Sequence, residues 1–218
     1  MKNIEISPSI LSCDFRYLDK EINSIKDYVK YLHFDVMDGN FVPNISFGIP
    51  VLESINKGNY GLVNDVHLMI INPLKYIDRF IDAGANIVTF HYEACVNDME
   101  IDKAINLIHS KNALAGLSIK PGTDICAIIP FAMKLDLVLV MSVEPGFGGQ
   151  KFNPNALNKI KRLDDLRKKE GYHYLIEVDG GINEVTGKEC INNGADILVA
   201  GSYIFKNEDR KKACNSLK

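Results

Sequence analysis

Several features are missing from this chain of 218 residues, and each absence narrows the class of protein. Its most apolar run, LDLVLVMSV, is far shorter than the roughly 20 residues that a membrane-spanning helix needs. The amino-terminal MKNIEISPSIL has no long apolar stretch of the kind found in signal peptides. Positive charge is not in excess, because 25 Lys and Arg stand against 28 Asp and Glu. We therefore expect a cytoplasmic protein with neither a nucleic-acid nor a membrane partner.

Cysteine is sparse, and its spacing excludes two further classes. The five cysteines are odd in number and form no CxxC pair. Neither a disulfide framework nor a cysteine zinc site is indicated, which fits a reducing compartment. The sequence also lacks a GxGxxG motif after its first β-rich run, which disfavours a dinucleotide-binding sheet.

What the chain does contain is a regular alternation of β-rich runs and helical segments. A start-to-start spacing of about 21 to 38 residues suits strands joined by helices, and no break in composition suggests a linker. The sequence therefore predicts one α/β domain over residues 1–218, a single (β/α)8 TIM barrel, with an open doubly wound sheet as the alternative. AGANIV (83–88) and NGADIL (193–198) add a weak internal echo of this repeat. The predicted strands cover residues 4–9, 31–37, 63–69, 87–92, 115–120, 136–143, 174–179 and 197–201.

Four polar residues lie at or near the ends of the predicted strands. His33 and Asp35 alternate with apolar residues in HFDVM, so both point to the same face of their strand. His67 and Asp179 stand at the ends of the third and seventh runs. A barrel brings the carboxyl ends of its strands to one rim, where two imidazoles and two carboxylates could bind one ion. The mixed nitrogen and oxygen set favours Zn, Mn, Fe(II) or Co. A single His or Asp on a strand is more often a structural residue, so this prediction depends on convergence.

Glycine-rich segments follow the sixth, seventh and eighth runs. They are EPGFGGQ (144–150), DGG (179–181) and AGS (200–202). Glycine lets backbone N–H groups approach an anion closely, and barrels often bind a phosphate at the loops after strands seven and eight. Turns are rich in glycine for other reasons, but three such loops in succession favour a phosphate site.

The remaining candidates are less specific. Met37, Met69 and Met141 lie near the same strand ends and could be core filler or an apolar floor under a reactive carbon. Lys120 invites a Schiff-base interpretation, but nothing in the sequence near it indicates a lowered pKa. We leave His91 out of the catalytic set and expect His109 and His173 to be exposed.

A metal ion, two carboxylates and a phosphate grip together suggest proton abstraction beside a carbonyl. Asp35 and Asp179 could act on opposite faces of the substrate. One base suffices for many isomerisations, whereas two opposed acids point to inversion at carbon, that is, to an epimerase.

Six motifs resemble those of the ribulose-phosphate 3-epimerases: SPSILSCDF, HFDVMDGNFVPN, DVHLMI, KPGT, VMSVEPGFGGQKF and EVDGGIN. The resemblance runs in order from about residue 7 to residue 205. It implies a metal-dependent (β/α)8 barrel that interconverts D-ribulose 5-phosphate and D-xylulose 5-phosphate in the non-oxidative pentose phosphate pathway. It also implies a homo-oligomer, a dimer or a hexamer.

Residue roles follow from the resemblance by position. It implies one divalent transition metal ion held by His33, Asp35, His67 and Asp179, with Asp35 and Asp179 exchanging protons with the substrate. It places Met37, Met69 and Met141 around the intermediate. Tyr203 departs from the family, which often has a small residue there. The implied substrate contacts are Ser9, His67, Gly146, Phe147, Gly148, Gly149, Gly180, Gly181, Gly201 and Ser202.

Three alternatives stay open at this point. The nearest is a related epimerase acting on a six-carbon substrate such as allulose 6-phosphate, whose relatives look less glycine-rich in the sixth and seventh loops. A metal-dependent lyase or decarboxylase would need a lysine among the catalytic carboxylates. A non-catalytic sugar-phosphate sensor would not need the two acids.

Overall fold

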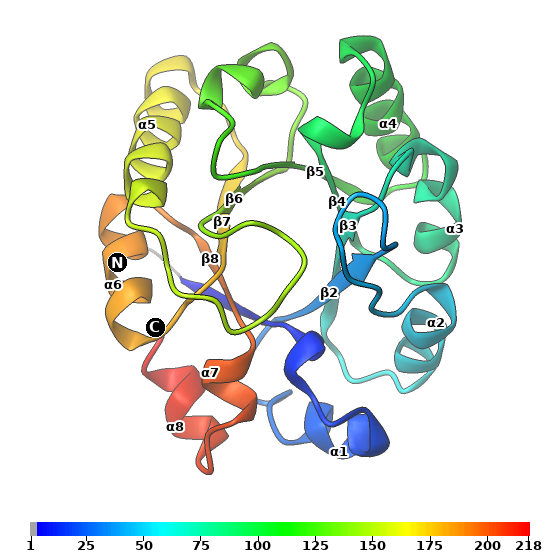
Figure 1. Ribbon diagram of the computed structural model, residues 1–218, viewed down its shortest axis with the longest axis vertical. Helices are drawn as coiled ribbons and strands as arrows, with labels where there is room; N and C mark the ends of the chain where they lie inside the picture. The colour runs from blue at the N-terminus through cyan, green and yellow to red at the C-terminus, as the bar shows by residue number, and fades with distance from the viewer. Residues whose placement is uncertain (1–3) are drawn as a thin grey trace.

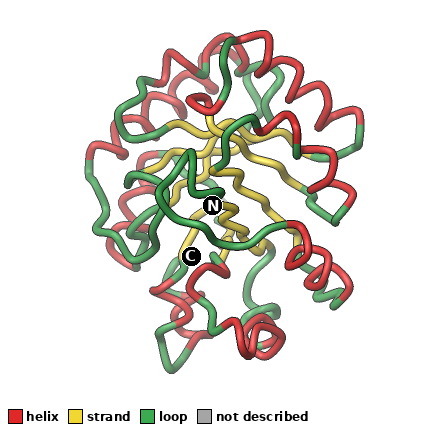
Figure 2. The backbone as a smooth tube through the Cα atoms, turned by 45° about the vertical axis from the view of Figure 1, so that its right-hand side comes forward, coloured by secondary structure: helices red, strands yellow, loops and turns green. Residues whose placement is uncertain are grey.

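The computed structural model describes residues 4–218, and its centre is one sheet of eight parallel strands. From β2 to β8 each strand pairs with the next one in sequence, and β1 pairs with β8. A parallel bridge between Ser9 and His33 brings β1 beside β2, so the sheet is a nearly closed (β/α)8 TIM barrel (Figures 1 and 2). The strands are β1 (Glu5–Pro8), β2 (Tyr31–Met37), β3 (Val63–Met69), β4 (Ile87–His91), β5 (Leu114–Ile119), β6 (Leu137–Met141), β7 (Leu175–Asp179) and β8 (Ile197–Ala200). All eight predicted strands are present.

Helices surround the strands on the outside, as Figure 2 shows in red around yellow. Among residues 4–218, no helix is both long and apolar enough to cross a bilayer. The α-helices are α1 (Leu18–Asn23), α2 (Ile49–Lys57), α3 (Ile77–Asp82), α4 (Asp98–Ser110), α5 (Asn155–Glu170), α6 (Glu184–Asn193), α7 (Ser202–Phe205) and α8 (Arg210–Asn215). The 3-10 turns are η1 (Ile10–Ser12), η2 (Phe15–Tyr17), η3 (Pro73–Lys75), η4 (Tyr92–Ala94), η5 (Ile125–Ala127) and η6 (Ile129–Phe131).

Helix α4 shows why these segments are helical. The Asn97 side chain accepts a hydrogen bond from the backbone of Glu100 and so caps the first turn. Ile101, Ala104 and Ile108 recur at helical spacing and are buried against the barrel. An apolar stripe of this kind stabilises a surface helix through packing more than through intrinsic propensity.

The connection between β5 and β6 is the exception among the predicted βα units. It contains the two 3-10 turns η5 and η6 in place of an α-helix. Pro130 stands in the first turn of η6, where it has no N–H to donate to an α-helical hydrogen bond.

The barrel interior changes character along its axis. Near the amino ends of the strands it is filled by apolar side chains, among them Tyr31, Ile87, Leu137 and Ile197. One step further along β2, β3, β4 and β7, the inward positions become polar and stay buried. A buried polar layer is costly unless its groups are paired, so it marks the half of the barrel where function is expected.

A repeated device ties the strands together at their amino ends. Asn86, Asp136 and Asp196 each directly precede an even-numbered strand. Their side-chain oxygens accept the backbone N–H groups of Asn64, Ala115 and Ile176 on the preceding strands, at 2.7–2.8 Å. Asn86 and Asp196 are the matching positions of AGANIV and NGADIL, so the internal echo in the sequence has this structural basis.

Candidate active site

A cavity opens at the carboxyl ends of the strands, where barrel enzymes place their chemistry. The loop from β6 to α5 lies across the centre of the barrel in the view of Figure 1. The side chains of His33 and His67 lie behind the cavity wall, fully buried. The cavity is lined by Ser9, Leu11, Ser12, Asp35, Met37, Met69, Met141, residues 143–150, residues 179–182, Val199, Gly201 and Ser202.

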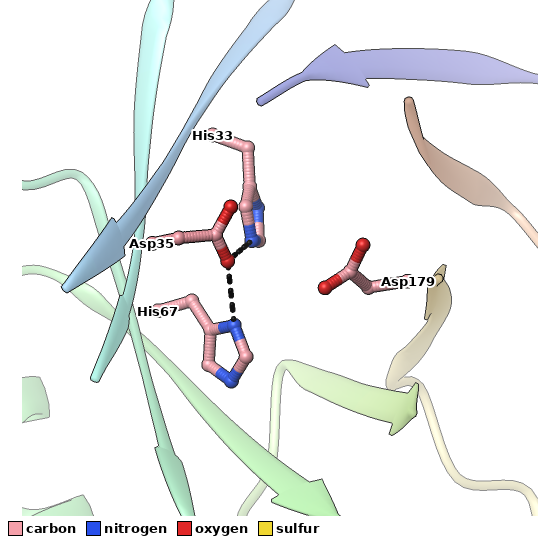
Figure 3. Close-up of side chains that lie close together, drawn as sticks. All are labelled: His33, Asp35, His67 and Asp179. Atoms are coloured by element: carbon pink, nitrogen blue, oxygen red, sulfur yellow. Dashed lines mark hydrogen bonds and ion pairs between the residues drawn. The ribbon is translucent and has the colours of Figure 1, made fainter. Parts of the chain in front are cut away.

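The four strand-end residues singled out in the sequence do converge. His33, Asp35, His67 and Asp179 each offer one nitrogen or oxygen atom, and these atoms lie within 4.8 Å of one another. Asp35 Oδ1 is 3.4 Å from His33 Nε2 and 3.3 Å from His67 Nδ1. Figure 3 shows Asp179 reaching toward these three from the opposite side of the barrel. Strands β2 and β3 therefore supply three donors, and β7 supplies the fourth.

A carboxylate on the neighbouring strand β3, that of Asp65, holds the His33 ring. Its Nδ1 lies 2.6 Å from Asp65 Oδ2, which also accepts a hydrogen bond from Ser7. Because an ionised carboxylate only accepts, Nδ1 carries a proton and Nε2 is directed at the cluster. Burial opposes a charge on His33, but Asp65 and Asp35 raise its pKa well above the usual value. Glu177, fully buried beside this pair, has its pKa raised by burial and by Asp65.

His67 is held in a different way, through a second histidine. Its Nε2 is 2.9 Å from Nε2 of His91, and His91 Nδ1 is 3.2 Å from Glu93 Oε2. Burial lowers the pKa of His91 to about 4. Burial alone would raise the pKa of Glu93, but hydrogen bonds from His91, Thr123 and Lys120 lower it to about 2. His91 is therefore neutral and Glu93 ionised near neutral pH.

The two carboxyl groups that line the cavity have opposite electrostatic surroundings. Burial opposes ionisation of Asp35, yet the two neighbouring histidines lower its pKa. Burial and the nearby Asp35 raise the pKa of Asp179. Environments that separate the pKa values of two acids are typical of a base paired with an acid.

The chemistry of the cluster fits a divalent transition metal ion. His33 Nε2 is buried and has no hydrogen-bond partner among residues 4–218, although it faces a carboxylate. Two imidazole nitrogens and two carboxylate oxygens are a donor set that Zn, Mn, Fe(II) and Co accept. An ion at this position would pair the unsatisfied nitrogen and offset the repulsion between the two carboxylates. The residues present therefore fit a divalent metal ion.

The apolar part of the cavity comes from the three methionines. Met37 and Met69 are paired in register on β2 and β3, and Met141 is paired with Asp179. All three line the cavity and are almost fully buried. Ser9 Oγ donates a hydrogen bond of 2.5 Å to Asp35 Oδ2. Ser9 thus holds Oδ2 of Asp35, while Oδ1 faces His33 and His67.

Glycines form the other wall of the cavity. Gly146, Gly149, Gly180 and Gly181 adopt positive φ angles that other residues rarely take. A Cβ on Gly201 would come within 2.5 Å of Ser12 Oγ, so any other residue there would displace the Ser12 hydroxyl. Phe147, at the tip of the loop after β6, is 57% exposed. The part of the cavity lining that belongs to residues 4–218 contains no Lys or Arg, so backbone N–H groups and serine hydroxyls are the available anion donors.

Sequence analysis left His91, Asp65, Glu93 and Glu177 without a role. The sequence did contain a signal for Asp65, Glu177 and His91. Each lies two residues before or after another polar residue of the same strand, so both side chains point into the barrel. Asp65 precedes His67, Glu177 precedes Asp179, and Thr89 precedes His91, as His33 precedes Asp35. Glu93 follows β4 in η4 and has no such signal.

The other residues considered in the sequence lie outside the cavity. The Lys120 ammonium sits 4.0 Å from the centre of the Phe41 ring, and His109 binds Asp136 at the opposite end of the barrel. His109 and His173 are exposed, as expected. Tyr203, which departs from the family pattern, donates or accepts a 2.9 Å hydrogen bond with Ser216 and so connects α7 to the end of α8.

Comparison with known proteins agrees with this geometry. Residues 5–205 match the model of the Ribulose-phosphate 3 epimerase family. This chain belongs to that family. A protein of Bacillus subtilis (strain 168) named ribulose-phosphate 3-epimerase is 43% identical, over 99% of this chain and 98% of its own. A protein of Treponema pallidum (strain Nichols) with the same name is 38% identical, over 98% and 96%. The chain is thus an epimerase.

Solved structures support the fold alone. The 3-keto-L-gulonate-6-phosphate decarboxylase of Vibrio cholerae superposes with a TM-score of 0.75, over 100% of this chain and 96% of its own. Only 11% of the aligned residues are identical. The barrel is therefore shared with enzymes of other chemistry, and function has to be argued from the site.

Proposed function

We propose that this protein interconverts D-ribulose 5-phosphate and D-xylulose 5-phosphate by two-base proton transfer at C3, with residues 1–218 acting as one catalytic domain. The observation that carries the proposal is the pair of carboxyl groups, Asp35 and Asp179, which line one cavity from opposite sides of the barrel. Relatives that carry the epimerase name over nearly the whole chain support the choice of substrate.

Asp35 takes the C3 proton from one face of the substrate, and the electron pair moves into the C2 carbonyl to give an enediolate. Asp179 then gives a proton to the other face of C3, which inverts that carbon. In the reverse direction the two roles exchange. Ser9 holds one oxygen of Asp35 so that the other has a defined direction. Met37, Met69 and Met141 exclude water around the intermediate.

The phosphate group binds on the glycine side of the cavity. The loops after β6, β7 and β8 line the site with Gly146 to Gly149, Gly180, Gly181, Gly201 and Ser202. Their backbone N–H groups donate to the phosphate oxygens. The positions of these N–H groups are fixed by the fold, because they belong to the backbone. They therefore define the distance between the bound phosphate and C3.

His33, Asp35, His67 and Asp179 hold the divalent metal ion. When bound, the ion polarises the carbonyl and stabilises negative charge on the enediolate oxygens, a contribution of several kcal/mol. His33 Nε2 and His67 Nδ1 would bind the ion through their lone pairs, while Asp35 and Asp179 also exchange protons with the substrate.

A six-carbon ketose phosphate is the second candidate substrate, and the glycine-rich loops after β6 and β7 favour the smaller one. Neither a lysine-dependent lyase nor a sensor is supported. The cavity lining formed by residues 4–218 has no lysine, and binding alone does not require two opposed acids.

The test is incubation of the protein with D-ribulose 5-phosphate in D2O with Mn²⁺ or Zn²⁺, followed by NMR. We expect xylulose 5-phosphate with deuterium at C3. Exchange at C3 without inversion would contradict the two-base assignment. No exchange and no product with pentulose, but turnover of allulose 6-phosphate, would move the assignment to the six-carbon substrate.

A further inference from the structure

His67 is joined to a second buried histidine that the proposed mechanism does not use. His91, at the end of β4, is fully buried, and its Nε2 lies 2.9 Å from His67 Nε2. A hydrogen bond between two imidazole nitrogens contains one proton, so one ring donates and the other accepts. The direction of this bond decides which nitrogen of His67 carries a lone pair.

Glu93 sets that direction. Its Oε2 lies 3.2 Å from His91 Nδ1, and its Oε1 accepts the backbone N–H of Lys120 at 2.8 Å and the hydroxyl of Thr123. A carboxylate between three donors only accepts, so the proton of His91 resides on Nδ1. His91 Nε2 is then the acceptor, and His67 donates its Nε2–H to it. This leaves the lone pair of His67 on Nδ1, the nitrogen that faces Asp35.

The His91 ring is also fixed by packing. The Phe41 ring lies 4.8 Å from it, centre to centre, and the Lys120 ammonium covers the Phe41 ring at 4.0 Å. The His91 ring therefore has little freedom to turn away from His67. Glu93 and Phe41 together fix the position of His91, and His91 in turn fixes the orientation of His67.

We propose that His91 and Glu93 are positioning residues that set the tautomer of His67 and so present its Nδ1 lone pair to the divalent metal ion. The inference deepens the proposed function and rests on the metal dependence stated there. Residues behind a metal-bound histidine commonly fix its tautomer, and their loss typically lowers metal affinity by about 10–100-fold.

The other histidine of the cluster shows why this arrangement is distinctive. Asp65 binds His33 directly and fixes its tautomer in one step. His67 is fixed in two steps, through a neutral ring that can carry its proton on either nitrogen. One amide in place of Glu93 can therefore reverse the tautomers of both His91 and His67.

Glu93→Gln is the variant that reverses the chain with the smallest change of shape. The Lys120 N–H can only donate, so the oxygen of the new amide stays on that side and its NH2 group faces His91. His91 Nδ1 must then accept, its Nε2 carries the proton, and His67 is left with its proton on Nδ1. We expect Zn²⁺ affinity, measured by competition with a fluorescent chelator and without substrate, to fall by about 10–100-fold.

Glu100→Gln is the matched control. Glu100 lies in the same segment and accepts a backbone N–H from Val96, but it contacts neither histidine. We expect its Zn²⁺ affinity to equal that of the unchanged protein. If Glu93→Gln binds Zn²⁺ as tightly as Glu100→Gln does, the proposal is overturned.

A second measurement does not depend on any variant. In the Zn²⁺-loaded protein with ¹⁵N-labelled histidine, long-range ¹H–¹⁵N correlation assigns the proton of each ring. We expect His67 protonated on Nε2 and His91 on Nδ1, and a His91 proton on Nε2 would overturn the proposal. Absence of Zn²⁺ binding by the unchanged protein would remove the metal from the proposed function and this inference with it. Binding by the unchanged protein with no effect of Glu93→Gln would defeat only the inference.

Discussion

The two ends of the barrel treat buried polar groups in opposite ways. At the amino ends of the strands, Asp196 accepts the N–H of Ile176 and pairs with Arg167. Arg167 also binds Asp164 and the backbone oxygens of Tyr174 and Gly194. In the buried polar layer further along the strands, among residues 4–218, some atoms have no hydrogen-bond partner, including His33 Nε2, Thr89 Oγ1, Ser118 Oγ and both Glu177 oxygens.

This difference separates stability from function within one fold. Paired polar groups lower the free energy of the native state, whereas unpaired buried groups are tolerated where a ligand or ion completes them. We therefore expect changes at the amino end to lower the melting temperature and leave turnover intact. Changes at the carboxyl end should lower turnover and leave the melting temperature nearly unchanged.

The largest effect is expected from removal of the metal ion. Exhaustive chelation should abolish turnover, because His33, His67 and the two aspartates lose the ion that completes them. Added Zn²⁺, Mn²⁺ or Co²⁺ should restore it, while the far-ultraviolet circular dichroism stays unchanged throughout. Full activity in protein shown by elemental analysis to contain no metal would remove the ion from the mechanism.

Arg167→Met tests the opposite end. The change leaves Asp164 and Asp196 without their cation, and breaking such a buried pair costs about 3 kcal/mol. For a chain of this length the melting temperature should fall by roughly 6–12 °C. Calorimetry and a coupled assay below the transition check both halves, since kcat should be unchanged. A large loss of kcat at an unchanged melting temperature would break the comparison.

Much of this division was visible in the sequence, and the reason is periodicity. The alternation in HFDVM predicted an inward His33 and Asp35, because side chains in a strand point to alternate faces. The echo between AGANIV and NGADIL likewise marks a shared structural role, since Asn86 and Asp196 each clamp the preceding strand. Both are local features that a barrel repeats.

Other parts could not be read from local pattern. The contact between His67 and His91 depends on the register of two strands and on ring orientation, which spacing does not define. Asn followed by Pro, as at Asn72, is a common sequence pattern at a helix start, but Asn72 adopts a left-handed conformation with no side-chain cap bond, and η3 precedes α3. The cytoplasmic location and the homo-oligomer stay predictions.

Ser9→Ala sharpens the comparison at the carboxyl end. Ser9 donates to Asp35, and loss of a hydrogen bond to a charged group costs about 1.5–3 kcal/mol. We expect kcat/KM to fall roughly tenfold or more, since each 1.4 kcal/mol is a factor of ten. Steady-state kinetics and the melting temperature are measured together. A lower melting temperature with unaltered kcat/KM would assign Ser9 to stability instead.

The smallest effect is a pH dependence of stability at the amino end. Burial opposes ionisation of Asp164, but Lys168 and Arg167 lower its pKa below the usual 3.8. A lowered pKa contributes stability that is present above about pH 4 and is lost as the pH falls further. Melting temperatures between pH 5 and pH 2 should therefore drop more steeply in the unchanged protein than in Asp164→Asn. Parallel curves would show that the ion pair adds nothing.

The central claim is that Asp35 and Asp179 serve opposite faces of one carbon. The most direct measurement follows deuterium at C3 in D2O for Asp35→Asn and Asp179→Asn, each offered both pentulose phosphates, with bound metal measured in parallel. We predict that neither variant inverts C3, and that each exchanges the C3 proton of one epimer only, a different epimer in each variant. Inversion by either variant, or exchange of the same epimer by both, would contradict the account.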